Sequence, residues 1–167
     1  MTLRHTIASI CICGLAAIAG PLPAMAQDIT TPPEGSVPLL AVELLAIYGN
    51  HTWRWGDSGG AYFKTDGRRF FAYSIDGDKQ TSVIAEGKWR ITDLGKLCFD
   101  ATWSSDTGSY PATKCFLHAA VGDDIYARTM EEGKGWYLFK HAKTDPSDEF
   151  NNLVRGDLAS VGGDKSQ

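Results

Sequence analysis

The sequence predicts a mainly β fold, an eight-stranded antiparallel up-and-down barrel with one N-terminal helix. From His51 onward, apolar residues recur with the period of two that is typical of half-buried strands. Turn signals, of which Asp66-Gly67 is the strongest, follow one another at short intervals, and connections this short force neighbouring strands to run antiparallel. Before His51, one segment has apolar residues at helical spacing. These observations place a single helix ahead of a meander of strands.

The first 26 residues have the pattern of a secretory signal peptide. A basic start at Arg4 and His5 precedes an apolar run at residues 7–18, and the small-x-small sequence Ala24-Met25-Ala26 follows. The alternative is a membrane anchor, but the run is shorter than the roughly 20 residues that span a bilayer. We therefore expect cleavage after Ala26 and a periplasmic or secreted protein without a transmembrane segment.

Cleavage would leave 141 of the 167 residues, which is one domain of ordinary size. The first 26 residues hold one basic residue, Arg4, and no acidic one, so the remainder has 15 basic against 20 acidic residues and a formal net charge of −5. No block of like charge stands out. Nucleic acid and anionic membranes both require a basic surface, so neither is expected as a partner.

We divide the remaining chain into a linker at 27–36, a barrel domain at 37–143 and a polar tail at 144–167. The linker holds Thr, Pro and Gly without an apolar period. In the tail, Ser147 could cap a short helix that covers the barrel, and residues beyond Leu158 are expected to be disordered.

The predicted helix begins near Ser36 and Pro38, which suit a cap and a first turn, and stops at Gly49. It would have about three turns, which is too short for stability in isolation. We expect it to lie on the sheet or to plug one end of the barrel. Its apolar stripe contains Leu40, Leu44 and Ile47.

Eight strands are predicted between the turn signals. Alternation is clearest at 82–92 and 96–103, where one face reads apolar and the other polar. Eight sequential strands close into a small, lipocalin-like barrel without a free edge, and a sandwich of two meanders is the alternative. The predicted strands lie near 51–55, 60–65, 68–75, 82–92, 96–103, 112–120, 125–130 and 135–141.

Two cysteines remain after the predicted cleavage, Cys98 and Cys115. The hairpin loop between Trp103 and Ala112 is centred close to residue 106 or 107. In an antiparallel hairpin, the residue numbers of each opposed pair add up to the same total, which is twice the number at the centre of the loop. Cys98 and Cys115 sum to 213, which gives a centre at 106.5. A cross-strand disulfide on the outer face is therefore predicted for an exported chain, and two buried free thiols are the alternative.

No catalytic constellation, metal site or cofactor site is predicted, so the chain is not expected to be an enzyme. His51, His118 and His141 are scattered; they could converge on zinc in a barrel, but no short-range motif supports this. Ser58-Gly59-Gly60 is not a nucleophile elbow. Asp66 and Asp93 lie at turns, where carboxylates accept backbone hydrogen bonds.

Aromatic residues give the best binding hypothesis. The stretch 51–73 holds two tryptophans, two tyrosines and three phenylalanines, and strand alternation divides them between two faces. Some of that apolar surface must lie at the barrel mouth or outside, unless the helix and the tail cover it. The candidate ligand-binding residues are Trp53, Trp55, Ser58, Tyr62, Tyr73 and Trp89.

Several motifs carry a resemblance to a family of small exported bacterial proteins, found mostly in proteobacteria and catalogued as a domain of unknown function. They are Tyr48-Gly49-x-x-Thr52-Trp53-x-Trp55, Asp66-Gly67-Arg68, Gly87-x-Trp89 and Leu97-Cys98. The resemblance covers about residues 40–141. It implies an exported protein and supplies no catalytic residues.

A second motif, Ser58-Gly59-x-x-Tyr62, is similar to a loop of periplasmic lysozyme inhibitors, which are small disulfide-bonded β-barrels. We therefore predict a non-enzymatic binding or envelope-accessory module that uses aromatic residues. Its partner would be a small apolar or glycan ligand, or an envelope protein. The alternative is an inhibitor of lysozyme or another hydrolase that acts through the loop at 56–60.

Overall fold

The computed structural model describes residues 30–76 and 81–159, so the predicted signal peptide lies outside the described residues. The described residues form ten strands, one α-helix and two short 3-10 helices. In chain order these are β1 (Val37–Pro38), α1 (Ala41–Tyr48), β2 (His51–Arg54), β3 (Gly59–Phe63), η1 (Asp66–Arg68), β4 (Arg69–Asp76), β5 (Thr81–Ile91), β6 (Lys96–Ser105), β7 (Gly108–Val121), β8 (Asp124–Thr129), β9 (Tyr137–Lys140), η2 (Glu149–Asn152) and β10 (Leu153–Arg155).

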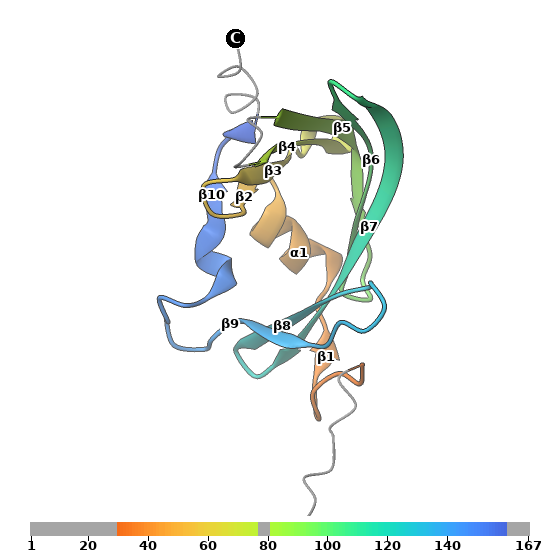
Figure 1. Ribbon diagram of the computed structural model, residues 1–167. Helices are drawn as coiled ribbons and strands as arrows, with labels where there is room; N and C mark the ends of the chain where they lie inside the picture. The colour runs from red at the N-terminus through yellow and green to blue at the C-terminus, as the bar shows by residue number, and fades with distance from the viewer. Residues whose placement is uncertain (1–29, 77–80, 160–167) are drawn as a thin grey trace, which may run out of the picture.

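All ten strands belong to one antiparallel sheet that curls into a half-barrel (Figure 1). Its order is β10-β2-β3-β4-β5-β6-β7-β8-β9, and β1 pairs with β7. Each of the eight predicted strands is present, with its ends shifted by a few residues. The eight-stranded, closed barrel is wrong, however, because two more strands exist and β9 does not pair with β2.

The tail explains why the sheet stays open. After β9 the chain passes through η2 and returns to β2, where Leu153 pairs with Trp53 and Arg155 with His51. This pairing occupies the edge of β2 that a closed barrel would have joined to β9. The Thr52 hydroxyl, fully buried, donates to the Gly156 carbonyl at 2.7 Å and accepts from an amide N–H farther along the tail. Part of the predicted tail therefore belongs to the sheet.

The helix lies inside the curve of the sheet (Figure 1) but begins later than predicted. Val37–Pro38 is extended, because it pairs with β7 as β1. The helix starts at Ala41, whose N–H donates to Asp93 Oδ1 at 2.9 Å, while the Leu40 N–H donates to a Glu43 carboxylate oxygen at 2.7 Å. These two carboxylates satisfy donors that a helix N-terminus leaves unpaired. In the described residues, no helix combines the length and apolar character needed to cross a membrane.

The core fills the concave side around the helix. Leu44 and Tyr48 of α1 are fully buried there. Rings from β3, β4 and β6 meet them, and Phe70 stacks on Phe99 with centroids 4.2 Å apart. Tyr48 contacts Phe63 edge-on at 5.2 Å. Aromatic pairs of this kind stabilise a fold beyond the contribution of their buried area. This part of the interior is therefore filled by packed aromatic rings.

The cysteine prediction is confirmed in register and in bonding. Cys98 is directly opposed to Cys115 across β6 and β7, and their sulfur atoms are bonded with Cα atoms 4.1 Å apart. Cys98 alternates with the inward-facing Leu97 and Phe99, so the bridge is on the convex side. The bond covalently joins β6 and β7, which form the longest hairpin of the sheet.

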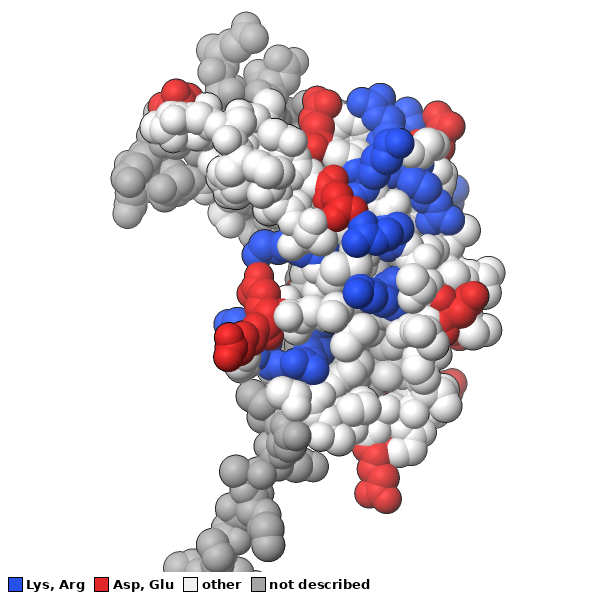
Figure 2. Space-filling model, turned by 90° about the vertical axis from the view of Figure 1, so that its right-hand side faces the viewer, with Lys and Arg blue, Asp and Glu red and all other residues white. Residues whose placement is uncertain are grey.

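The convex face of the sheet carries charges of both signs (Figure 2). Arg69, Lys88 and Asp100 are neighbours in register across β4, β5 and β6. Asp100 forms an ion pair with Arg90 and accepts a hydrogen bond from the Thr113 hydroxyl at 2.6 Å. Figure 2 shows the basic side chains gathered in a band on this face, with acidic side chains mainly at its margins.

Candidate functional site

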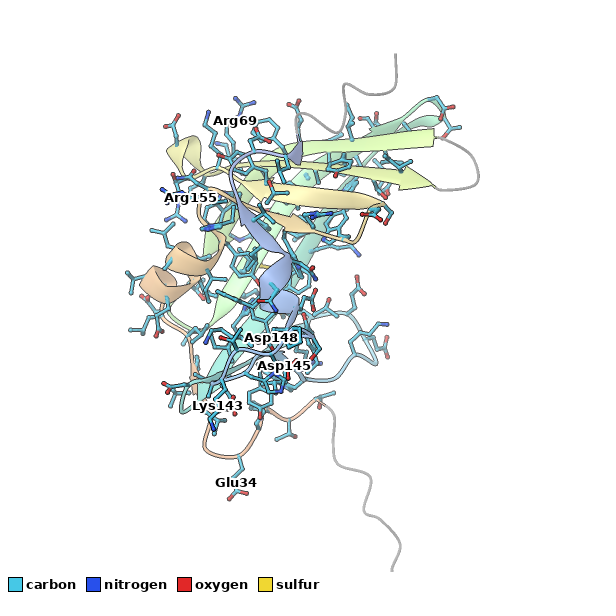
Figure 3. The ribbon with its side chains drawn as sticks, turned by 90° about the vertical axis from the view of Figure 1, so that its left-hand side faces the viewer. Glu34, Arg69, Lys143, Asp145, Asp148 and Arg155 are labelled. Carbon is cyan, nitrogen blue, oxygen red and sulfur yellow. A yellow bond between two sulfur atoms is a disulfide. The ribbon has the colours of Figure 1, made fainter. Side chains whose placement is uncertain are left out.

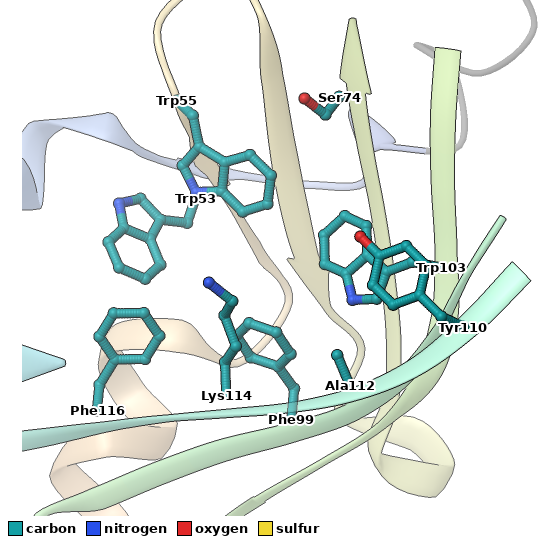
Figure 4. Close-up of a pocket in the computed structure, with 9 residues that line it drawn as sticks. All are labelled: Trp53, Trp55, Ser74, Phe99, Trp103, Tyr110, Ala112, Lys114 and Phe116. Atoms are coloured by element: carbon teal, nitrogen blue, oxygen red, sulfur yellow. The ribbon is translucent and has the colours of Figure 1, made fainter. Parts of the chain in front are cut away.

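A pocket of about 400 Å³ opens on the concave face of the sheet, beside the β6–β7 hairpin (Figure 4). Its volume lies within the roughly 300–1,000 Å³ that is typical of small-molecule sites. Six of its nine lining side chains are aromatic, and the wall comes from strands far apart in the sequence. The lining residues are Trp53, Trp55, Ser74, Phe99, Trp103, Tyr110, Ala112, Lys114 and Phe116.

The register of β6 and β7 assembles one side of the pocket. Trp103 is opposed to Tyr110, and Phe99 is opposed to Lys114. Because side chains alternate between faces along a strand, all four point to the concave side with the buried Leu97. Between these two pairs, Ala101 is opposed to Ala112. Small side chains at inward positions leave the space that larger residues would fill.

Aromatic side chains that line the pocket contact one another. Trp55 and Trp103 face each other with centroids 6.5 Å apart and planes inclined by 26°. On the other side, Trp53 contacts Phe116 edge-on at 5.1 Å. Trp53 is only 4 % exposed, whereas Tyr110 is 59 % exposed. The pocket therefore has a buried floor and an accessible rim.

Lys114 is the one charged side chain among the lining residues. It lies between Phe99 and Phe116 in Figure 4, and its ammonium group donates to Glu131 Oε1 at 2.7 Å. Both side chains of this ion pair are about half exposed. The hydrogen bond from Lys114, together with its charge, lowers the pKa of Glu131. The pair therefore carries opposite charges at the rim.

The structure brings two of the six predicted ligand-binding residues, Trp53 and Trp55, into this pocket. Tyr62 and Tyr73 alternate with buried Ala61, Phe63 and Ala72, so they lie on the convex side.

The other two predicted residues have structural partners. The Ser58 hydroxyl donates to the Trp55 carbonyl at 3.0 Å within the β2–β3 turn. Trp89 is 2 % exposed, its indole N–H donates to the Lys64 carbonyl at 2.8 Å, and the Arg68 guanidinium lies over its ring. The six residues therefore do not form one site.

Sequence reasoning did not identify the other seven lining residues, which are Ser74, Phe99, Trp103, Tyr110, Ala112, Lys114 and Phe116. The sum of residue numbers that opposes Cys98 to Cys115 also opposes Trp103 to Tyr110. Extending it along the hairpin would have identified this side of the pocket. Ser74 had no comparable signal, because its place depends on how far the sheet curls.

A buried pair of titratable groups lies elsewhere in the interior. The Tyr48 hydroxyl is 2.8 Å from His118 Nε2, and His118 Nδ1 is 3.3 Å from the Gly95 carbonyl. The carbonyl can only accept, so Nδ1 carries the proton and Nε2 accepts from Tyr48. Burial lowers the pKa of His118 to about 4, with the Gly95 bond opposing it in part, and burial raises the pKa of Tyr48. Both side chains are almost fully buried, which fits a satisfied core pair.

A second cluster lies between β9 and η2, where His141, Asp145 and Asp148 place one ligand atom each within 4.8 Å of the others. Figure 3 shows Asp145 and Asp148 close together in this connection. Both carboxylates already accept hydrogen bonds: Asp148 accepts from His141 Nδ1 at 2.5 Å, and Asp145 Oδ1 accepts from the Ser147 N–H and hydroxyl. The bond to Asp148 raises the pKa of His141. These contacts organise the loop. The alternative that the sequence analysis did not favour, a zinc site formed by His51, His118 and His141, is not found among the described residues.

Comparison with known protein families identifies the family of this chain. The model of a family described as "Protein of unknown function (DUF995)" matches residues 14–159. Neither the curated proteins nor the solved structures contain a match.

Proposed function

Because the chain belongs to the DUF995 family, whose description assigns no function, we propose from its own geometry that it is a non-enzymatic module that binds a small ligand in the concave aromatic pocket. The observation that carries this proposal is the pocket itself. It offers six aromatic side chains around about 400 Å³ of open space on the concave face of the sheet. Apolar surface that remains accessible in this way typically marks a ligand or partner site.

The lining residues also support binding over catalysis. They include no Asp, Glu, His or Cys. The Lys114 ammonium donates to Glu131, and within the described residues no hydrogen bond joins it to Ser74, although general-base activation of that hydroxyl would require one. We propose a periplasmic or secreted location for the module, which the Cys98–Cys115 disulfide supports because such bonds persist in oxidising compartments.

The inhibitor hypothesis has less support. It requires the loop at 56–60 to present polar groups to the active site of another enzyme. The Ser58 hydroxyl instead donates to the Trp55 carbonyl inside the turn. Gly59 and Gly60 are buried strand residues. The loop therefore offers few free polar groups, and the pocket is the better-supported site.

Titration with the neutral apolar probe N-phenyl-1-naphthylamine tests the proposal. We expect saturable 1:1 binding, seen as a rise in probe fluorescence with energy transfer from tryptophan. Trp103→Ala removes one wall of the pocket and is expected to weaken the affinity about tenfold, since burying an aromatic contact is worth about 1 kcal/mol or more.

The matched control is Trp136→Ala. The Trp136 indole donates to the Thr30 carbonyl and does not line the pocket. We expect this variant to bind the probe with the affinity of the unmodified protein. Absence of saturable binding, or an equal loss in both variants, would refute the pocket as the binding site.

A further inference from the structure

The polar groups of the pocket constrain the chemistry of its ligand. The lining side chains offer one ammonium group, on Lys114, and two hydroxyls, on Ser74 and Tyr110, beside the indole N–H groups. A bound sugar buries several hydroxyls, and each needs a hydrogen-bond partner to offset its desolvation. The lining side chains contain no carboxylate or amide to accept from such hydroxyls. The composition of this surface favours an apolar body with a single polar group.

Lys114 determines the sign of that polar group. Its position opposite Phe99 directs it to the concave face, so the aliphatic part of the side chain lies among aromatic rings and the ammonium reaches the rim (Figure 4). Long basic side chains commonly cover apolar surface with their stems in this way. An ammonium at the edge of an aromatic pocket complements an anion at one end of an apolar ligand.

The present partner of Lys114 can be exchanged. Glu131 lies in the connection between β8 and β9, outside the pocket, and both partners are about half exposed, at 48 % and 49 %. Ion pairs this exposed contribute roughly 0–1 kcal/mol, so releasing Glu131 costs little. A ligand anion held against the aromatic wall would form its charge-assisted hydrogen bond in a drier environment.

We propose that the ligand is a single-chain amphiphile with an anionic head, such as a medium-chain fatty acid. This inference rests on the proposed binding function. The acyl chain contacts the rings of Trp55, Trp103 and Phe99. The carboxylate accepts a hydrogen bond from Lys114 Nζ and replaces Glu131 there.

The experiment measures displacement of N-phenyl-1-naphthylamine at pH 7.5 by three ligands with ten-carbon chains, each below its critical micelle concentration or, for the alcohol, its solubility limit. They are decanoate, decanol and decyltrimethylammonium. We expect decanoate to bind about tenfold more tightly than the other two. Lys114→Met keeps the stem and removes the charge; it is expected to weaken decanoate about tenfold and decanol far less, because a neutral head group loses no charge–charge attraction. Glu131→Gln removes the competing anion and is expected to strengthen decanoate a few-fold.

Lys134→Met is the charge-matched control, because it removes a positive charge from the same region without changing a lining residue. Equal affinity for decanoate and decanol, with no effect of Lys114→Met, would overturn the anionic-head assignment and leave the binding function standing. Equal weakening by Lys114→Met and Lys134→Met would also overturn it, since general electrostatics would then suffice. If neither the probe nor any of the three ligands binds, the proposed function itself fails.

Discussion

Reduction of the Cys98–Cys115 disulfide is expected to lower the free energy of unfolding by about 3 kcal/mol. The bond joins residues 17 positions apart across β6 and β7. Closing a loop of this size removes conformations from the unfolded chain, which corresponds to about 3 kcal/mol in the chain-entropy model. β7 also carries pocket residues and pairs with β1 and β8, so a looser hairpin affects most of the sheet.

Urea unfolding with and without a reductant measures this effect. The control is the double variant Cys98→Ala/Cys115→Ala, which has no bond to lose and should give the same unfolding curve in both conditions. A reductant-independent curve for the unmodified protein would contradict the prediction. So would two titratable thiols in the denatured, unreduced protein.

Acidification is expected to destabilise the fold through His118 by about 3 kcal/mol. Burial lowers the pKa of His118 from 6.5 to about 4 in the folded protein. The unfolded chain therefore binds a proton that the folded protein rejects, and the stabilising contribution is complete above pH 6.5. It is lost progressively as the pH falls from 6.5 to 4, and each pKa unit corresponds to about 1.4 kcal/mol.

NMR titration of the imidazole signals measures the cause directly. The His118 signal should remain that of a neutral ring at pH 5, whereas His141, whose pKa is raised by Asp148, should be protonated there. His118→Gln removes the titrating group and can still pair with Tyr48, so its stability should depend less on pH between 6.5 and 4. A His118 midpoint near 6.5 would show that the ring is not buried as described.

The strands were predictable because their signals are local. Alternation and turn chemistry placed the strand at residues 81–91 within a residue or two, and hairpin arithmetic gave the opposition of Cys98 and Cys115. The structure departs from the prediction where distant segments meet. Leu153–Arg155 is too short to show a period, and it becomes a strand because the edge of β2 is available. Val37–Pro38 is extended because β7 pairs with it, which shortens the helix that its sequence favours.

The candidate site was only partly predictable for a related reason. Composition revealed more aromatic side chains than a small interior needs, but the assignment to faces depends on register. Alternation along the strands directs Tyr62 and Tyr73 to the convex side, whereas it directs Trp103 to the concave side. The curl of the sheet then brings Ser74 of β4 within reach of β7, and no local pattern encodes that distance.

The indole N–H signals of the five tryptophans give the most direct test of the proposed pocket. Trp53, Trp55 and Trp103 line it, whereas Trp89 and Trp136 lie outside and donate to backbone carbonyls. In ¹H–¹⁵N spectra recorded while N-phenyl-1-naphthylamine is added, we expect the first three signals to shift with one common saturation curve and the other two to stay in place. Unchanged signals for the three pocket tryptophans, or equal shifts for all five, would contradict the proposal that this pocket is the binding site.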